Sequence, residues 1–240
     1  MQEVCWERLK ASELRALAEA GAVVIIPVAA IEQHGPHLPT MTDTRIGHAL
    51  AVRAAQKAYP SRPTVVTPVV WSGLSEHHMA FGGTLTLKVS TFLAILDDLV
   101  TSLLRHGFRD ILISNSHGGN IGAIQQAAAS LAMATGAHVV ATTYINEAAA
   151  EIGAILEDQA GINHACEGET SMMLALEPDL VGADLAGAKN VVAAGYTRAG
   201  KGSYRWRPFG SITRTGVAGN PTRANVEKGE ALLRVISDAL

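Results

Sequence analysis

The sequence predicts an α/β fold: a three-layer α/β/α sandwich with a mostly parallel central sheet, formed by residues 1–240 as a single domain. Four short apolar runs rich in β-branched residues indicate strands that are covered on both faces. Helical patterns separate these runs, and strands that alternate with helices form right-handed βαβ units. The sequence contains no internal repeat and no long polar linker, so we expect no domain boundary.

The predicted elements follow one another along the chain. Residues 12–20 form a short amphipathic helix with Ser12 as its N-cap, and Gly21 ends it. Residues 195–220 are irregular, with the stretch YRWRPF among glycines, so we expect a loop or flap at the rim that contacts substrate. The strands lie in the apolar runs 22–30, 64–70, 110–114 and 137–144, and the longer helices lie at 44–58, 91–106, 121–135 and 223–239.

Composition and charge restrict the function. The formal net charge of −3 provides no general basic field, so we expect a small molecule as partner, and neither nucleic acid nor a membrane. No apolar run reaches the about 20 residues that cross a bilayer, and the N-terminus lacks the pattern of a secretory signal. Two cysteines, Cys5 and Cys166, are too few for a disulfide framework. We therefore expect a soluble protein of the cytoplasm.

Polar side chains follow the predicted strands. Ligands bind at the carboxyl ends of strands in an open parallel sheet, so these segments are the candidates for a site. The first strand leads into IEQHGPHLPTMTD, the third leads into NSHGGN, and HACEGETS precedes a helical pattern. These segments carry Glu32, His34, His37, Asp43, His117, His164, Glu167 and Glu169. Carboxylates and imidazoles without a set of thiolates are the ligands of Zn, Mn or Fe, so the pattern predicts a metal site.

The charge of this cluster favours two ions. If Glu32, Asp43 and Glu169 are ionised, two divalent cations and one hydroxide neutralise them. Without cations, like charges about 4 Å apart would each cost roughly 4 kcal/mol at an effective dielectric constant of about 20. Asp43 comes back from the far side of the loop, and its two carboxylate oxygens can each take one metal.

Several of these segments resemble those of the creatininase, or creatinine amidohydrolase, family. They are EQHGPHLP followed by TD, then NSHGGN, HACEGETS, and the late GVAGNP with EKGE. The resemblance runs from about Ile26 to Glu230. It implies a creatininase-like three-layer fold, a binuclear metal centre at the strand ends and a homo-oligomer, often a hexamer.

The resemblance also implies the metal ligands. Glu32 and His117 are expected to ligate one metal, and His34 the other. Asp43 is expected to bridge the two. The cofactors are then two divalent metal ions, Zn in the first place, with Mn or Fe as alternatives.

One departure from the family concerns a ligand. The enzyme that opens creatinine has a glutamate ligand where this chain has Gly119. We therefore assign the fifth ligand to Glu169. A tryptophan that covers creatinine in that enzyme falls near Ala160 here, which argues against creatinine itself as the substrate. The family's proton carrier matches His164.

These assignments predict a metal-dependent hydrolase that cleaves a C–N bond of a small amide. We expect this amide to be cyclic. A water that bridges two ions has its pKa lowered toward about 7, so hydroxide is available at neutral pH to attack the carbonyl carbon. His164 suits transfer of a proton to the leaving amine. Asn120 is expected to donate a hydrogen bond to the developing oxyanion or to orient the substrate.

Three alternatives stay open. The chain could be a formamide deformylase of the same family. It could be a nucleophilic hydrolase in which Cys166 and His164 form a thiol and base pair. It could also be a non-catalytic ligand-binding protein that uses HGGN as a glycine-rich cradle, although no GxGxxG or Walker pattern accompanies it.

Other polar residues have two interpretations each. His37 caps backbone carbonyls or acts directly, and Glu167 is a solvated acid at a helix start or a functional group. His77 and His78 line the pocket or lie at the surface. Residues 205–207 grip an anionic or planar substrate or form a solvated edge of the flap.

Overall fold

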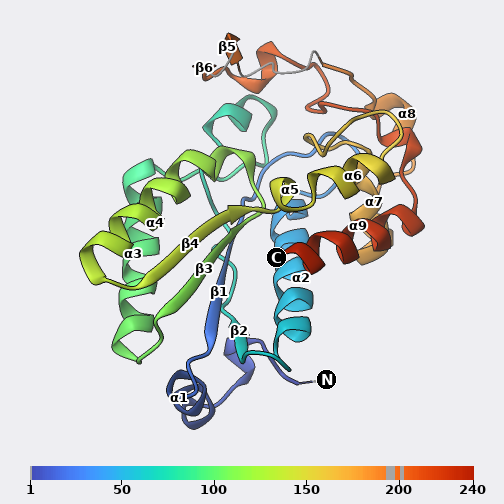
Figure 1. Ribbon diagram of the computed structural model, residues 1–240. Helices are drawn as coiled ribbons and strands as arrows, with labels where there is room; N and C mark the ends of the chain where they lie inside the picture. The colour runs from blue at the N-terminus through green and yellow to red at the C-terminus, as the bar shows by residue number, and fades with distance from the viewer. Residues whose placement is uncertain (1, 193–197, 201–202) are drawn as a thin grey trace.

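A four-stranded parallel sheet forms the centre of the protein, with the strand order β2-β1-β3-β4. The computed structural model describes residues 2–192, 198–200 and 203–240. Helices cover both faces of the sheet (Figure 1), so the predicted three-layer α/β sandwich is confirmed. The strands are β1 (Val23–Val28), β2 (Thr64–Val66), β3 (Asp110–Asn115) and β4 (His138–Thr143), and the helices beside them are α2 (Thr42–Ala58), α3 (Val89–Arg105) and α4 (Ile121–Thr135).

The central strand β1 explains why both faces are covered. Val24, Ile26 and Val28 point to one face and share an apolar core with α3 and α4. Ile25 points to the opposite face and packs with residues of α2. An apolar run without alternating polar residues has no face to offer to water, so the strand needs helices on both sides.

A second apolar core lies between α2 and the two helices α7 (Glu167–Leu176) and α9 (Val226–Ala239). Leu50 of α2 packs there with Met172 of α7 and Leu232 of α9. The α7 and α9 helices approach closely, because a Cβ at Gly229 would lie 2.0 Å from the carbonyl oxygen of Ser171. This packing holds α7, and with it the first turn that carries Glu169, against the rest of the molecule.

The remaining elements are short. The α-helices are α1 (Ala11–Glu19), α5 (Tyr144–Glu147), α6 (Ala149–Ile155) and α8 (Leu185–Ala188). The strands β5 (Arg198–Gly200) and β6 (Ser203–Tyr204) form an antiparallel pair. The 3-10 helices are η1 (Trp6–Arg8), η2 (Glu76–Phe81), η3 (Gly118–Asn120), η4 (Pro178–Leu180), η5 (Phe209–Ser211) and η6 (Pro221–Arg223). No helix among the described residues is long and apolar enough to cross a membrane.

Some predicted boundaries are wrong. Helix α1 begins before Ser12, and its first turn is capped by the Glu13 side chain, which accepts a hydrogen bond from the Lys10 backbone at 2.7 Å. The second strand ends at Val66, after which the chain joins the sheet again only at Val70, by a single bridge to β1. The last helix starts at Val226, preceded by η6.

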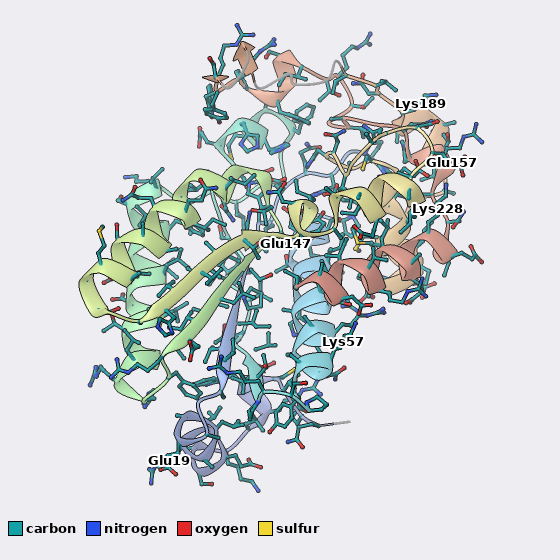
Figure 2. The ribbon with its side chains drawn as sticks, in the orientation of Figure 1. Glu19, Lys57, Glu147, Glu157, Lys189 and Lys228 are labelled. Atoms are coloured by element: carbon teal, nitrogen blue, oxygen red, sulfur yellow. The ribbon has the colours of Figure 1, made fainter. Side chains whose placement is uncertain are left out.

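The two interpretations of Glu167 are decided by its burial. Its side chain is fully buried and pairs with Lys228 Nζ, and it accepts hydrogen bonds from the backbone of Glu157 and Asp158. Lys228 also bonds Glu157 at 2.6 Å, and Figure 2 shows these two residues beside each other. Glu167 therefore ties α7 to α9 and to the loop after α6, and it is not a solvated acid.

Candidate metal centre

A cavity of about 720 Å³ opens at the carboxyl ends of the strands. Its polar wall comes from the loop after β1, the start of α2, the turn after β3 and the start of α7. Its apolar wall comes from the start of α4, from the segments after β4 and from the flap. The polar lining includes Glu32, Asp43, His77, His78, His117, His164 and Glu169, and the apolar lining includes Ile121, Ile145, Ile162, Phe209 and Ile212.

One half of the cluster of carboxylates and imidazoles is centred on His34, which is fully buried. Its Nδ1 donates to the carbonyl oxygen of Glu32 at 3.1 Å, so the lone pair of Nε2 points inward. Nε2 lies 3.2 Å from Asp43 Oδ1 and 3.7 Å from Glu169 Oε2. A lone pair between two carboxylates requires a cation, either a proton on the imidazole or a metal ion.

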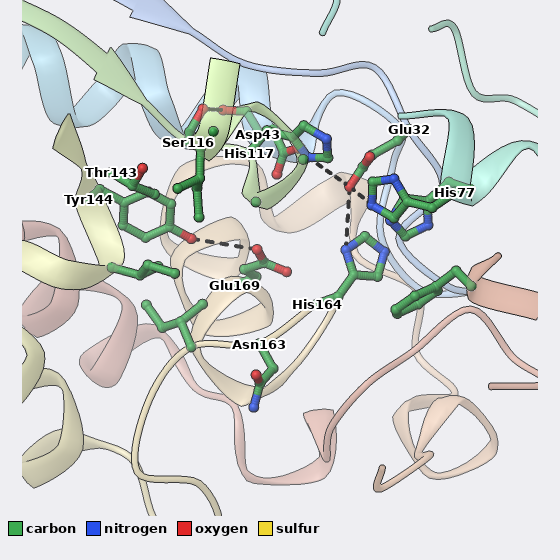
Figure 3. A pocket seen from close by; sticks show the side chains of 18 of the residues that line it. Glu32, Asp43, His77, Ser116, His117, Thr143, Tyr144, Asn163, His164 and Glu169 are labelled. Atoms are coloured by element: carbon green, nitrogen blue, oxygen red, sulfur yellow. Dashed lines mark hydrogen bonds and ion pairs between the residues drawn. The ribbon is translucent and has the colours of Figure 1, made fainter. Parts of the chain in front are cut away.

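The other half is centred on His117. Its Nε2 lies 3.2 Å from the carbonyl oxygen of Leu74, to which it donates. Its Nδ1 lies 3.2 Å from Glu32 Oε1 and 3.2 Å from Asp43 Oδ2. The two oxygens of Asp43 therefore face two different histidines. Figure 3 shows the imidazoles gathered around Glu32, with Glu169 facing them across the cavity.

The electrostatics of these groups fit a bound cation. Burial lowers the pKa of His34, but the carboxylates of Asp43 and Glu169 outweigh it and raise the pKa to about 10. Burial also opposes ionisation of Glu32, yet the neighbouring histidines, His117 first, hold its pKa well below the usual value. Burial raises the pKa of Glu169 to about 7. These groups ionise only together with a positive charge among them.

A metal ion fits this donor set. Three of the buried side-chain atoms that have no hydrogen-bond partner among the described residues belong to this cluster, namely Glu32 Oε2, His34 Nε2 and Asp43 Oδ2. Buried polar atoms are normally paired, so unpaired ones that face each other suggest a ligand. Imidazole nitrogen and carboxylate oxygen are ligands of Zn, Mn and Fe. All five predicted ligands lie in this cluster, with Glu169 included.

The local fold explains how the loop after β1 reaches the site. Strand β1 ends before Glu32, so Glu32 and His34 converge through a tight turn and not through a continued strand. Gly35 has a φ of 68°, a conformation that favours glycine, and a Cβ there would lie 2.4 Å from Val217. Asp43 lies in the first turn of α2, where the helix dipole favours a carboxylate.

Glu169 is oriented by its own helix start. Its Oε2 accepts a hydrogen bond from the Ala165 backbone at 2.5 Å, and Ala165 has a φ of 52°. Its Oε1 lies 3.5 Å from the hydroxyl of Tyr144, which is buried and lines the cavity. Tyr144 was not predicted from the sequence. It directly follows β4, so the same argument from strand ends could have identified it.

The tautomer of His164 follows from a count of donors. Gln33 Nε2 donates one hydrogen to the carbonyl oxygen of Gly216 at 3.1 Å and the other to His78 Nδ1 at 2.7 Å. His164 Nε2 also lies 3.0 Å from Gln33 Nε2, but neither hydrogen of that amide is left for it, so we assign to His164 Nε2 the hydrogen that bonds the carbonyl oxygen of Gln33 at 2.8 Å. His164 Nδ1 keeps its lone pair and lies 3.4 Å from Glu32 Oε1. Burial holds the pKa of His164 well below its usual value, which favours the neutral ring.

The prediction for Asn120 does not agree with the structure. Its side chain is fully buried, and its Oδ1 accepts from the Leu74 backbone at 2.9 Å. Its Nδ2 donates to the carbonyl oxygen of Ala29 at 3.1 Å and to Asn115 Oδ1 at 3.2 Å. Because both hydrogens of the amide are engaged, Asn120 has no donor left for an oxyanion. It holds the Leu74 segment against the sheet.

The thiol and base pair is also contradicted. Cys166 is fully buried, and its Sγ accepts a hydrogen bond from the Asn163 backbone at 3.2 Å. Burial raises the pKa of the Cys166 thiol to about 12, so a thiolate is not available at neutral pH. The ring nitrogens of His164 face Gln33 and Glu32 instead.

The turn after β3 shows why a ligand is missing at position 119. A Cβ at Gly119 would lie 2.2 Å from the carbonyl oxygen of Leu74 and 2.4 Å from His117 Nε2. A glutamate has no room in this arrangement, which leaves Glu169 as the carboxylate that faces His34 together with Asp43. The glycine serves close packing, so it gives no support to a phosphate cradle.

The residues with two interpretations divide into three groups. His77 and His78 line the cavity. His37 is buried outside the cavity, and its Nε2 lies 2.9 Å from Thr170 Oγ1, so it joins the loop to α7. In the flap, Arg207 lines the cavity while Trp206 is 53% exposed. Residues 193–197 and 201–202, which belong to the predicted flap, lie outside the described residues.

An α/β sandwich with carboxylates and imidazoles clustered at the strand ends has the donor set of a metal-binding protein. The chain belongs to the creatininase family, because the family model described as creatinine amidohydrolase matches residues 7–240. The resemblance inferred from the sequence motifs is confirmed.

The relatives of the chain extend this finding. It is 31% identical over 228 residues to the mycofactocin precursor peptide peptidase of Mycolicibacterium smegmatis, covering 93% of this chain and 85% of that protein. It is also similar to a solved structure named creatininase Mn, with a TM-score of 0.81, 26% identity and coverage of 99% and 96% of the two chains. A mutant creatininase of Zn-Zn type has a TM-score of 0.79, 26% identity and coverage of 100% and 96%.

Proposed function

We propose that the protein hydrolyses a C–N bond of a small amide with the help of two divalent metal ions. One observation carries the proposal: Asp43 directs Oδ1 to His34 and Oδ2 to His117, at 3.2 Å in both cases. A carboxylate placed in this way between two imidazoles is suited to bridge two ions.

The ligands divide into two sets that share Asp43. Glu32 and His117 would hold one ion, and His34 and Glu169 the other. When bound, two such ions supply a Lewis acid for the amide carbonyl and make a water molecule more acidic. Zn is the first candidate and Mn the second, since structures similar to this one are named for both metals; Fe stays an alternative.

The protein itself supplies proton transfer and exclusion of water. His164 takes up a proton at Nδ1, which lies 3.4 Å from Glu32 Oε1, and delivers it to the amine that leaves. The hydrogen bond from its Nε2 to Gln33 keeps the ring in the tautomer that this transfer needs. Ile145, Ile162 and Phe209 contribute apolar surface to the cavity, and they limit the access of water to the substrate.

The cavity admits more than one kind of amide. Its volume of about 720 Å³ lies within the range of pockets that bind small molecules of drug size, roughly 300 to 1,000 Å³. A small amide, cyclic as in the creatininase reaction, is one candidate, with a formamide as its close variant. A short peptide is the second, because the relative from Mycolicibacterium smegmatis is named a peptide peptidase. A homo-oligomer, a single domain and a place in the cytoplasm remain predictions.

A metal analysis combined with a substrate panel tests the proposal. The purified protein is expected to contain two equivalents of Zn, Mn or Fe. Cyclic amides, formamides and short peptides are then tested with metal-loaded protein, with protein treated with a chelator, and after metal is returned. Turnover that needs metal on one class supports the proposal and names the substrate class. Metal-free protein with undiminished turnover would contradict it.

A further inference from the structure

We propose that His77 is a further ligand of the ion held by Glu32 and His117, so that the two ion positions have unequal donor sets. The proposal rests on the metal centre described above and adds a residue to it. It concerns which metal each position prefers, beyond the hydrolysis itself.

The geometry places His77 at one ion position only. Glu32, His77 and His117 each offer a ligand atom, and these atoms lie within 4.8 Å of one another. The rings of His77 and His117 are nearly parallel, with an angle of 19° and centroids 5.7 Å apart. Figure 3 shows His77 on the side of Glu32 that is away from Glu169. His34, Asp43 and Glu169 form a separate group of ligand atoms that does not include His77.

The nitrogens of His77 are available. The side chain of His77 is half-buried and lines the cavity. Neither of its ring nitrogens has a hydrogen-bond partner among the described residues. The neighbouring His78 differs, because its Nδ1 is bonded to Gln33 at 2.7 Å. A histidine that points into a cavity of carboxylates with both nitrogens free is suited to ligate a cation.

The same segment that orients His117 brings His77 to it. The Leu74 carbonyl accepts from His117 Nε2 at 3.2 Å, and the Leu74 backbone is held by Asn120 at 2.9 Å. The Ser75 backbone is fixed by Thr86 Oγ1 at 3.0 Å, immediately before η2 begins. His77 is therefore held on an anchored turn. Hydrogen-bonded groups commonly fix the orientation of metal ligands in this way.

Gly119 permits this approach. A Cβ at Gly119 would lie 3.0 Å from His77 Cε1, in addition to its collision with the Leu74 carbonyl at 2.2 Å. Any side chain at position 119 would push η2 away from His117. The glycine and the histidine at position 77 thus belong to one arrangement.

The consequence is a difference in metal preference. The first position would have two imidazoles, His77 and His117, with the carboxylates of Glu32 and Asp43. The second would have one imidazole, His34, with the carboxylates of Asp43 and Glu169. Imidazole suits Zn, Ni and Cu, whereas carboxylate and water suit Mn and Mg. We expect Zn to bind the first position more tightly, and Mn to be tolerated better at the second.

The test measures metal binding and not turnover. Metal-free protein is titrated with Zn²⁺ by equilibrium dialysis and with Co²⁺ by visible absorption, for the wild type, His77→Phe and Glu76→Gln. His77→Phe keeps a ring of similar size, and Glu76→Gln changes an exposed neighbour in the same 3-10 helix. For His77→Phe, one of the two Zn²⁺ dissociation constants is expected to rise by about 10- to 100-fold or more, with a changed Co²⁺ spectrum. Glu76→Gln should bind as the wild type does.

Controls separate the possible failures. The melting temperature of metal-free His77→Phe should equal that of the metal-free wild type, and His77→Asn serves as the second variant if it does not. Wild-type affinity at both positions with an unchanged Co²⁺ spectrum would overturn the proposal and leave the metal centre intact, whatever happens to turnover. A wild type that binds neither ion would instead contradict the proposed function.

Discussion

The metal centre and the apolar core beneath α3 and α4 are buried to the same degree but differ in what they bury. Phe92, Leu96 and Ile113 are fully buried in the core among other apolar side chains. Glu32 and His34 are as deeply buried in the centre, but among charges. Both regions rest on the same sheet, one on its face and one at the carboxyl ends of its strands.

The difference determines what each region needs in order to be stable. Apolar side chains stabilise the fold by leaving water, at about 25 cal/mol for each Å² buried. A buried carboxylate without a partner costs free energy instead. The core is therefore complete within the chain, whereas the centre depends on a cation. Substitutions in the two regions should therefore have different effects on metal content and on stability.

The Asp43→Ala substitution should break the metal centre. Because Asp43 faces both His34 and His117, its loss should remove both ions and lower turnover by about 10³-fold or more. Metal content by mass spectrometry and turnover on the substrate found in the panel are measured together. Asp97→Ala, on the exposed side of α3, is the matched control. An Asp43→Ala protein with full metal content would refute the bridging assignment.

The His164→Gln substitution should separate proton transfer from metal binding. Without Nδ1 as a proton carrier, kcat should fall by about 10²- to 10⁴-fold, while both ions stay bound. The exposed His106→Gln is the control, and it should change neither quantity. If metal content falls in parallel with kcat, His164 is a ligand and not the proton carrier.

The Phe92→Ala substitution should have the opposite signature. Phe92 is fully buried on α3, and loss of its ring should lower the free energy of unfolding by about 3 to 5 kcal/mol. The decrease should be the same with and without metal, and the metal content should stay at the wild-type value. The free energy of unfolding is measured by urea denaturation, once with metal bound and once without it. Thr91→Ala, at the exposed neighbour, should cost within about 0.5 kcal/mol. A loss of metal in Phe92→Ala would mean that the two regions are coupled.

Removal of metal should destabilise the wild type. Ions that bind only the folded chain add about 2.7 kcal/mol each at a concentration of about 100 Kd. For a chain of this size about 1 kcal/mol corresponds to roughly 2 to 4 °C, so the melting temperature should fall by about 5 to 10 °C for one ion. The same chelator should leave the Asp43→Ala protein unchanged. A wild-type melting curve that does not move after verified removal would speak against the centre.

The sequence predicted the scaffold well because local patterns determine it. The β-branched runs became β1, β2, β3 and β4, and the ligands predicted at the strand ends meet in one cluster. The failures have non-local causes. Asn120 bonds Leu74, 46 positions away, and Ala29, 91 positions away, and no local pattern reveals such partners. The proposed role of His77 as a ligand depends in the same way on Gly119 and Asn120, which allow η2 to lie close to His117.

The Cys166→Ala substitution should have the smallest effect and thereby complete the comparison. Cys166 belongs to the apolar core around α7 and not to the cavity, although it is three residues from Glu169 in sequence. Turnover should stay within a few-fold of the wild type, and the free energy of unfolding should fall by about 1 kcal/mol. With a pKa raised to about 12 by burial, the thiol should react with a disulfide reagent only after unfolding. In the Cys5→Ala protein Cys166 is the remaining thiol, so the labelling rate measured there is that of Cys166. Rapid labelling of native Cys5→Ala protein, or a loss of turnover beyond 100-fold in Cys166→Ala, would return the thiol to the reaction.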